Sequence, residues 1–198
     1  MKSIGLFFGS FNPVHIGHLI LANAIVENSD LAELWFVVSP QNPFKKKENL
    51  LGERHRLDMV ARALTHYPKM RASDIEFSLP KPNYTINTLA YLEEKYPGYL
   101  FSIIVGEDNL CGIHRWKNAE KLIEKYRILV YPRKYTHEDR EMNIYFLEHE
   151  NVTKIQAPKI EISSTHIREM IKLGKNIRPL LPPEVYAYLE GSPLYKSQ

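Results

Sequence analysis

Two histidines three residues apart, His15 and His18, are the side chains in this sequence whose types and spacing best suit chemistry. They follow an apolar run at residues 4–8, with the length and bulk of a buried strand, and a cluster of turn-forming residues at 9–13. From Ile16 onward the apolar residues recur at helical spacing. A strand, a glycine loop and a helix in this order present unpaired backbone N–H groups to an anion. The stretch therefore predicts a phosphate-binding site.

The glycines and the histidines of this stretch have distinct expected roles. Gly9 has no Cβ, so the backbone there allows an anion to approach closely. Gly17 leaves open the face of the first helical turn that carries both histidines. Because a helix N-terminus is already partially positive, His15 and His18 gain most there if an anion lies among them. Two capping or surface histidines are the structural alternative, which the complete string of residues disfavours.

A second group of polar side chains lies at residues 162–168, ISSTHIR. Ser163 or Ser164 is a good N-cap for the helix that follows, and the segment also supplies unpaired N–H groups and the guanidinium of Arg168. Serines before a helix usually do no more than cap it. Together with the histidine loop, however, the segment indicates a second element that could hold phosphate groups.

Apolar runs alternate with helical periodicity along the chain, which predicts a parallel sheet covered by helices. Ligands bind at the carboxyl ends of such strands, where Gly106 and Asp108 follow the strongest apolar run. The charged segment 136–150 is a further helix candidate. The inward face of helix 84–96 is expected to comprise Ile86, Leu89, Ala90 and Leu92. The expected strands are 4–8, 34–39, 70–73, 99–105, 127–131 and 152–155, and the expected helices begin at 16 and span 53–65, 84–96, 118–125, 164–173 and 183–190.

The string GSFNPVHIGH, residues 9–18, resembles the G-x-F-x-P-x-H-x-G-H signature of the HIGH-motif nucleotidyltransferases, and residues 162–168 resemble their second signature, ISSTxIR. These enzymes join a nucleotide to a phosphorylated acceptor and release pyrophosphate. The resemblance implies an α/β fold with a Rossmann-like, doubly wound, mostly parallel sheet in a single domain, 1–198, whose C-terminal helical part spans about 164–198. It implies ATP binding by Gly9, Ser10, Phe11, His18, Gly106, Asp108, Ile162, Ser163, Ser164 and Arg168.

Further segments are similar to the nicotinate mononucleotide adenylyltransferases within that superfamily. Residues 84–89 resemble their Y-T-x-D-T-L segment, with Asn87 where the subfamily more often has Asp. By this resemblance Thr85 would cap a helix whose N–H groups receive the nicotinate carboxylate. Trp116, placed after G-x-D, would stack on the pyridine ring.

The loop at residues 40–47 resembles the subfamily's P-x-x-x-P-P-H-K but is shorter. It leaves open whether Lys45 or Lys46 reaches phosphate. The acceptor-binding set that the resemblance implies is Asn12, Lys45, Lys46, Tyr84, Thr85 and Trp116.

The implied reaction needs no general base, because the acceptor phosphate is already an anion at neutral pH. The protein has to position two anions and stabilise charge on the α-phosphate and the departing pyrophosphate. We expect direct in-line transfer of the adenylyl group of ATP to nicotinate mononucleotide, without a covalent intermediate. Mg²⁺ would be held mainly by phosphate oxygens of ATP, with no metal ligands assigned in the protein. The expected catalytic residues are His15, His18, Lys46 and Arg168.

Composition limits the other function classes. The net charge is +3, and the only basic tract is residues 45–47, so the sequence favours a small anionic ligand over nucleic acid. No apolar run is long enough to span a membrane, and no targeting signal precedes the first strand. The single cysteine, Cys111, excludes an internal disulfide and favours a cytoplasmic protein. The oligomeric state stays open, a homo-oligomer included.

Three alternatives use the same motifs. The acceptor could be nicotinamide mononucleotide or phosphopantetheine, or the chain could be a nucleotide-sensing module without turnover. Trp116, residues 84–89 and the chain length favour the nicotinate acceptor. A class I aminoacyl-tRNA synthetase fragment is dismissed, because residues 69–73 match its second signature poorly and lie too near the first.

Overall fold

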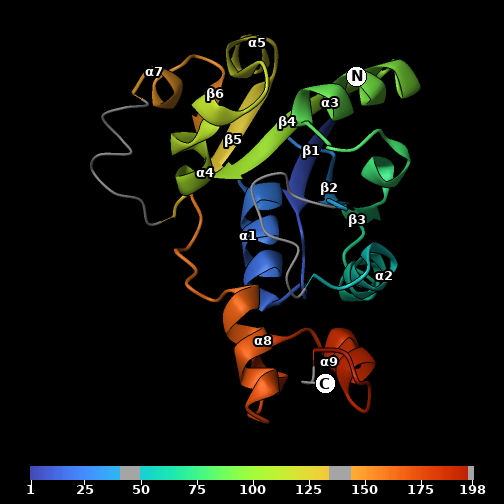
Figure 1. Ribbon diagram of the computed structural model, residues 1–198. Helices are drawn as coiled ribbons and strands as arrows, with labels where there is room; N and C mark the ends of the chain where they lie inside the picture. The colour runs from blue at the N-terminus through green and yellow to red at the C-terminus, as the bar shows by residue number, and fades with distance from the viewer. Residues whose placement is uncertain (41–49, 134–143, 196–198) are drawn as a thin grey trace.

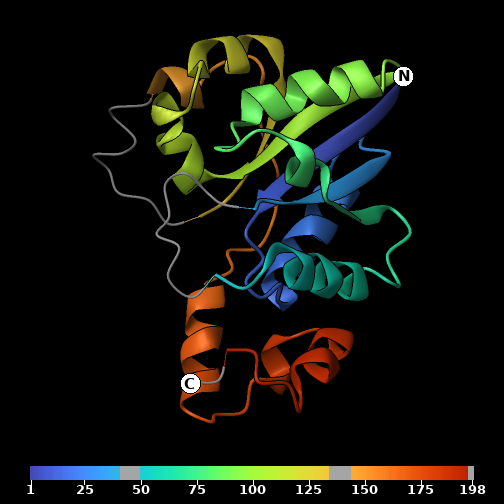
Figure 2. The ribbon, with the colours of Figure 1, turned by 45° about the vertical axis from the view of Figure 1, so that its right-hand side comes forward.

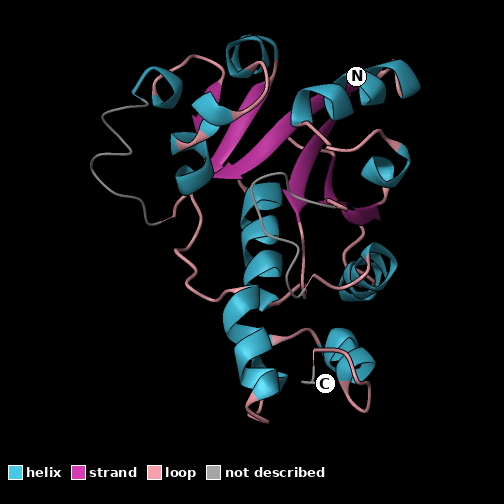
Figure 3. Ribbon diagram, in the orientation of Figure 1, coloured by secondary structure: helices cyan, strands magenta, loops and turns pink. Residues whose placement is uncertain are grey.

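The computed structural model describes residues 1–40, 50–133 and 144–195. In this part of the chain six strands form one sheet in the order β3-β2-β1-β4-β5-β6, and every neighbouring pair is parallel. The chain order reverses between β1 and β4, which makes the carboxyl ends of these two strands the expected ligand crevice. The strands, magenta in Figure 3, are β1 Lys2–Gly9, β2 Glu33–Val38, β3 Met70–Ser73, β4 Tyr99–Gly106, β5 Arg127–Tyr131 and β6 Val152–Lys154. The α/β, doubly wound fold predicted from the sequence is confirmed.

Helices connect the strands and cover the sheet (Figure 1). The α-helices described are α1 Ile16–Glu27, α2 Glu53–Ala63, α3 Thr85–Lys95, α4 Glu107–Cys111, α5 Ala119–Lys125, α7 Ile144–Leu147, α8 Ser164–Lys172 and α9 Pro183–Leu189. Short 3₁₀ segments are η1 Ile75–Ser78, η2 Ile113–Arg115 and η3 Arg178–Leu180. The expected strands and helices are all present within two residues of their predicted bounds. Most of the candidate helix 136–150 lies outside the described residues, and its described part contains α7. The sequence did not predict α4 or the 3₁₀ segments, because they are too short to show a helical period.

The sheet is buried on both faces, and its strands send alternate side chains to two hydrophobic cores. On β1, Phe7 enters one core, while Ile4 and Leu6 enter the other. The core that contains Phe7 is closed by α1, α2, α8 and α9, and the opposite core by α3, α4 and α5 (Figure 2). This two-sided burial explains why the strands appear in the sequence as continuous apolar runs.

The inward face of α3 differs from the expectation at one position. Leu89 and Leu92 are buried, and Ile86 packs against the same core. Ala90 is exposed, and Thr88 takes the inward position instead. The hydroxyl of Thr88 donates a hydrogen bond to the carboxyl group of Glu76 at 2.9 Å. A polar residue occupies the inward face of α3 because η1 supplies it with a buried partner.

The C-terminal helices α8 and α9, orange to red in Figure 1, lie beyond α1 and α2. Val185 and Leu189 of α9 are buried in the same core as Met59 of α2. At the edge of this contact the His55 ring and the Tyr188 hydroxyl are 2.6 Å apart. A single domain spanning the whole chain stays a prediction. In the described ranges no helix has both the length and the apolar content needed to cross a membrane.

Candidate active site

Two cavities, of about 370 and 340 Å³, open at the carboxyl ends of β1 and β4. They are neighbours, because several residues contribute to the lining of both. The shared residues are Phe7, Phe8, Gly9, Asn109 and Tyr131. Two adjoining cavities at the point where the strand order reverses suit an enzyme that brings two ligands together.

The smaller cavity begins at the glycine loop that follows β1. Phe11 has a φ of 45°, in the left-handed region, and its ring folds back over Gly9. A Cβ atom on Gly9 would lie 2.7 Å from that ring. The sequence assigned the open space at Gly9 to an approaching anion, but the Phe11 ring occupies it. Phe11 is itself almost fully buried, so it shapes the wall of the cavity from the core.

The two histidines stand side by side at the start of α1. His15 is the N-cap residue with an extended backbone, rather than a member of the first helical turn. Its backbone N–H donates to Nδ1 of His18 at 3.2 Å, and the two rings stack with centroids 3.7 Å apart. Because Nδ1 of His18 accepts this bond, the ring carries its proton on Nε2. Both histidines line the smaller cavity, and His18 can act there as a neutral N–H donor.

His15 is held neutral by its surroundings. The side chain is buried, and Nδ1 has no hydrogen-bond partner among the residues that the structure describes. Burial, and secondarily the positive charge of Arg133, lowers the pKa of His15 to about 4. At neutral pH the ring therefore adds a polar neutral group to the cavity, not a positive charge.

Gly17 brings the second signature segment against the first. A Cβ atom at this position would lie 2.7 Å from Cγ2 of Ile160 and 3.0 Å from Nδ1 of His15. The sequence predicted that Gly17 keeps the histidine face open. In the structure the space beside it admits Ile160, which itself lines the smaller cavity.

The second signature is bonded directly to the glycine loop. Ser163 is the N-cap of α8, as expected, and its hydroxyl accepts the backbone N–H of His166 at 3.2 Å. The Ser164 hydroxyl donates to the carbonyl oxygen of Pro13 at 2.9 Å. The Arg168 guanidinium donates to the carbonyl oxygen of Asn12 at 2.9 Å. Ten of the site residues predicted from the sequence line the smaller cavity: Gly9, Ser10, Phe11, Asn12, His15, His18, Ile162, Ser163, Ser164 and Arg168.

Of the residues predicted for the acceptor, Asn12 lines the smaller cavity and not the larger one. The larger cavity gathers three of the others. Tyr84, Thr85 and Trp116 all line it, and the ammonium group of Lys117 lies 4.7 Å from the centre of the Tyr84 ring. Tyr84 is the N-cap of α3, so the prediction that Thr85 caps this helix is wrong by one position. Thr85 is the first helical residue, and its backbone N–H is one of the unpaired donors at the N-terminus.

Gly106 and Asp108, both predicted to bind ATP, differ in their positions relative to the two cavities. Asp108, in the first turn of α4, lines the larger cavity and not the smaller one. Gly106 lines neither cavity. A Cβ atom on Gly106 would collide with the Asp108 carboxyl group and lie 2.8 Å from Cγ of Arg133. Gly106 therefore allows β4, α4 and the end of β5 to meet closely.

Glu76 is a site residue that the sequence did not reveal. It lines the larger cavity and is 3% exposed, and burial raises the pKa of its carboxyl group. Its backbone carbonyl also accepts the side-chain amide of Asn83 at 3.0 Å. No motif contains Glu76, and only the folding of η1 toward the end of β2 brings it to the cavity.

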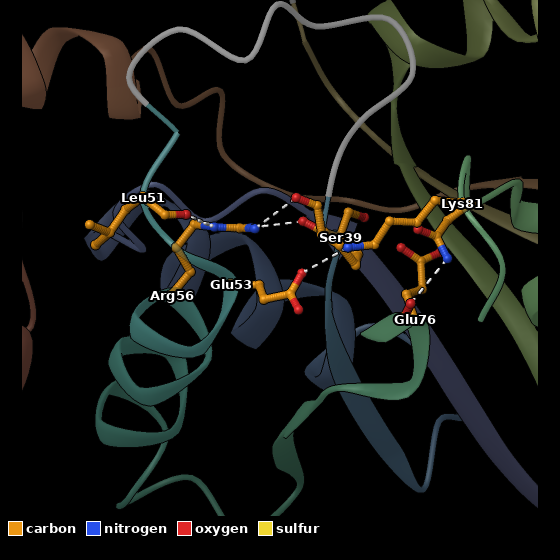
Figure 4. Close-up of polar contacts among 8 residues, drawn as sticks. Ser39, Leu51, Glu53, Arg56, Glu76 and Lys81 are labelled. Carbon is orange, nitrogen blue, oxygen red and sulfur yellow. Dashed lines mark hydrogen bonds and ion pairs between the residues drawn. The ribbon is translucent and has the colours of Figure 1, made fainter. Parts of the chain in front are cut away.

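Arg56 is a second such residue, and it is fully buried. Its guanidinium group donates to the carbonyl oxygens of Leu51 at 2.8 Å and Ser39 at 2.8 Å (Figure 4). It also donates to the carbonyl oxygens of Ser10 at 2.7 Å and Pro40 at 3.0 Å. Arg56 therefore joins the glycine loop, the end of β2 and the start of α2. In the sequence it resembles an ordinary surface position of an amphipathic helix.

Lys45 and Lys46 lie outside the described residues. Arg133, at the end of β5, lines the smaller cavity and donates to the carbonyl oxygen of Ile160 at 3.1 Å. Within the described ranges no group of three or more histidine, cysteine or acidic side chains is placed to hold a metal ion.

A family model described as cytidylyltransferase-like matches residues 6–170 of this chain. A protein of Flavobacterium psychrophilum named probable nicotinate-nucleotide adenylyltransferase is 54% identical, with 98% of each chain covered. A protein of the same name from Bacteroides thetaiotaomicron is 45% identical over 93% of this chain and 89% of its own length.

The fold is similar to the folds of solved structures. The nicotinic acid mononucleotide adenylyltransferase of Plasmodium falciparum, complexed with NaAD, superposes with a TM-score of 0.78 at 23% identity and 98% coverage of each chain. A structure of a Vibrio parahaemolyticus protein superposes with a TM-score of 0.72 at 20% identity, covering 100% of this chain and 98% of the other. Given the extent of the family match and the identity to the curated relatives, this chain belongs to the cytidylyltransferase-like family and, within it, to the nicotinate-nucleotide adenylyltransferases.

Proposed function

We propose that this protein transfers the adenylyl group of ATP to nicotinate mononucleotide, producing nicotinate adenine dinucleotide (deamido-NAD) and pyrophosphate for NAD biosynthesis. The observation that carries the proposal is the pair of cavities with a shared wall. One is lined by both nucleotidyltransferase signatures and the other by Tyr84, Thr85 and Trp116. The names of the curated relatives support the same reaction.

ATP would occupy the smaller cavity. Its phosphates would meet the N–H groups at the starts of α1 and α8, the Nε2 proton of His18 and the guanidinium group of Arg168. Asp108 lines the larger cavity next to Asn109, a residue of the shared wall, so its carboxylate would meet ribose hydroxyls where the two ligands adjoin.

Nicotinate mononucleotide would occupy the larger cavity. The ring of Trp116 offers a stacking surface for the pyridine ring. The nicotinate carboxylate would lie at the N-terminus of α3, where the N–H of Thr85 and the partial positive charge of an 11-residue helix favour an anion. A neutral amide in the same place would gain less from the N–H donor and from the partial positive charge. This favours nicotinate mononucleotide over nicotinamide mononucleotide as the acceptor.

In this arrangement a phosphate oxygen of the acceptor attacks the α-phosphorus of ATP. The new P–O bond forms as the bond to the bridging oxygen breaks, and that electron pair leaves with pyrophosphate. No proton has to be removed from the acceptor. His18 and Arg168 stabilise the charge that accumulates on the phosphoryl oxygens, while His15 holds the His18 ring in place through its backbone N–H and its stacked ring.

Mg²⁺ would enter with ATP as part of the substrate. It would be bound mainly through phosphate oxygens of ATP, because Mg²⁺ prefers oxygen ligands. The cation would neutralise charge on the departing pyrophosphate. We also propose a cytoplasmic location, since the only cysteine, Cys111, is buried and no disulfide is needed to complete the fold.

The test is pyrophosphate release by the purified protein with ATP and Mg²⁺. Nicotinate mononucleotide, nicotinamide mononucleotide and phosphopantetheine are offered in parallel. A strong preference for the nicotinate compound is the expected result. Turnover with only another acceptor would overturn the proposed contents of the larger cavity. No turnover with any of the three, despite ATP binding, would identify a nucleotide sensor.

A further inference from the structure

Asn12, in the glycine loop, is bonded by groups from three distant parts of the chain. Its side-chain oxygen accepts the hydroxyl of Tyr195 at 2.6 Å and the backbone N–H of Leu51 at 3.3 Å. Its backbone carbonyl accepts the guanidinium group of Arg168. Asn12 is 5% exposed and lines the smaller cavity. The geometry of a residue of the first signature is thus set from outside that signature.

Tyr195 is the most distant of these partners, 183 residues away in the sequence. Its φ of 63° lies in the left-handed region, which a bulky aromatic residue seldom adopts. Its ring packs against the core closed by α1, α2, α8 and α9. The chain therefore holds an unfavourable backbone conformation at the position that sends a hydroxyl to the glycine loop.

The Tyr195 hydroxyl remains a donor at physiological pH. Burial raises the pKa of Tyr195, although the guanidinium groups of Arg168 and Arg56 act in the opposite direction. A protonated hydroxyl has a proton to donate, and Oδ1 of Asn12 has none. The bond therefore has one direction only, from Tyr195 to Asn12.

The neighbouring tyrosines of the C-terminal part do not make this contact. The Tyr186 hydroxyl donates to Glu190 at 3.0 Å within the same short stretch of chain. The Tyr188 hydroxyl pairs with His55 at the outer edge of the α2–α9 contact. The hydroxyls of Tyr186 and Tyr188 thus bond within the C-terminal part or to α2, and of these three tyrosines only Tyr195 bonds to the glycine loop.

We infer that Tyr195 is a positioning residue for the proposed adenylyl transfer. Because Tyr195 and Leu51 both donate to Oδ1, they fix the orientation of the Asn12 amide in the wall of the smaller cavity, where ATP is proposed to bind. Without the hydroxyl, the amide keeps only the longer bond from Leu51 and is oriented less firmly toward a bound anion. The inference rests on the proposed function for the identity of that anion.

The experiment compares Tyr195→Phe with Tyr186→Phe in the full chain. Each variant loses one hydroxyl from the same part of the molecule, and only the first loses a bond to the site. We measure kcat, KM for ATP, KM for nicotinate mononucleotide and the melting temperature. Tyr195→Phe should lower kcat/KM for ATP about tenfold, which is the effect expected from the loss of one hydrogen bond. KM for the acceptor should stay unchanged. Tyr186→Phe should match the wild type in all four measurements.

A double-mutant cycle with Asn12→Ala separates positioning from packing. If Tyr195 acts through the Asn12 amide, Tyr195→Phe has no further effect on kcat/KM in the Asn12→Ala background. An equal loss in both backgrounds, or wild-type kinetics for Tyr195→Phe, would overturn the inference. Calorimetric binding of a non-hydrolysable ATP analogue to the same variants tests it separately from the proposed reaction. If the wild-type protein binds the analogue but shows no turnover with nicotinate mononucleotide, only the proposed reaction is overturned.

Discussion

The two histidines of the first signature have different electrostatic surroundings although they lie three residues apart. His15 is buried beside the positive charge of Arg133, so its neutral form is favoured. His18 is partly exposed to the cavity and accepts a backbone N–H at Nδ1. The two histidines therefore have different roles. His15 builds the start of α1, and His18 presents the N–H donor.

The buried neutral state of His15 predicts a loss of stability in acid. The unfolded chain takes up a proton at a pKa near 6.5, whereas the folded chain does so only near 4. The contribution is complete above pH 6.5 and is lost as the pH falls toward 4. Between pH 7.5 and pH 5 the free energy of unfolding should fall by about 2 kcal/mol from this group.

Urea unfolding of His15→Asn at both pH values checks this prediction. Asparagine keeps an N-cap side chain but does not titrate, so the variant should lose that part of the pH dependence. The control is His166→Asn, since the His166 ring is exposed on α8. Equal pH dependence in wild type and His15→Asn would show that His15 is not the group responsible.

His18→Ala should lower kcat about a hundredfold, because it removes one donor that stabilises charge in the transition state. KM for nicotinate mononucleotide should change little, since His18 lines the smaller cavity and not the larger one, which is proposed to hold the acceptor. Steady-state assays with pyrophosphate detection measure both constants. His166→Ala is the matched control and should keep wild-type turnover. A kcat within threefold of the wild type would remove His18 from the catalytic set.

At the scale of elements, the site depends on close contacts between segments that enter it from different sides. Gly17 admits Ile160, Gly106 admits the Asp108 carboxyl group and Arg133, and Arg56 ties three backbone segments together. Each contact leaves no room for a change of side-chain size. The strand–loop–helix pattern was predictable, but the fit between these segments was not.

Gly17→Ala tests the contact between α1 and the segment around Ile160. Alanine is the better helix former by about 1 kcal/mol, but its Cβ would lie 2.7 Å from Ile160 and 3.0 Å from His15. Overpacking costs about 1–3 kcal/mol, so we expect a net loss of stability and a raised KM for ATP. Gly98→Ala is the control, because nothing lies within 4 Å of its Cβ position. A more stable Gly17→Ala variant would contradict the steric role.

Arg56→Met tests the joint between the glycine loop, the end of β2 and the start of α2. The variant keeps most of the apolar volume and leaves four carbonyl oxygens without their donor. We expect the free energy of unfolding to fall by about 3 kcal/mol or more. Arg54→Met, on the exposed side of the same helix, should change it by less than about 0.5 kcal/mol. Urea denaturation of both variants makes the comparison, and equal stabilities would contradict the role of Arg56.

At the scale of the whole molecule, the C-terminal helices share a core with the sheet. Val185 of α9, Ile167 of α8 and Met59 of α2 are all fully buried in it. Tyr195 then returns the chain to the glycine loop. We therefore expect the molecule to unfold as one cooperative unit, with no separate melting of residues 164–195.

Val185→Ala measures that cooperativity. Removing two buried methyl groups should cost about 2 kcal/mol, which lowers the melting temperature by roughly 4–8 °C for a chain of this length. The single transition should move as a whole in calorimetry. Leu173→Ala is the control, since Leu173 is 68% exposed. A separate early transition in Val185→Ala would show that the C-terminal helices form an independent unit.

The sequence by itself determined the order of strands and helices, the nucleotidyltransferase signatures and the residue types at the two cavities. These features are local: a strand, a glycine turn or a helix start depends on residues a few positions apart. The tertiary structure alone decided how the segments meet. Arg56, Glu76 and Tyr195 belong to no motif and reach the site through contacts between distant parts of the chain. The neutrality of His15 likewise follows from burial and a neighbouring charge, which only the folded chain supplies.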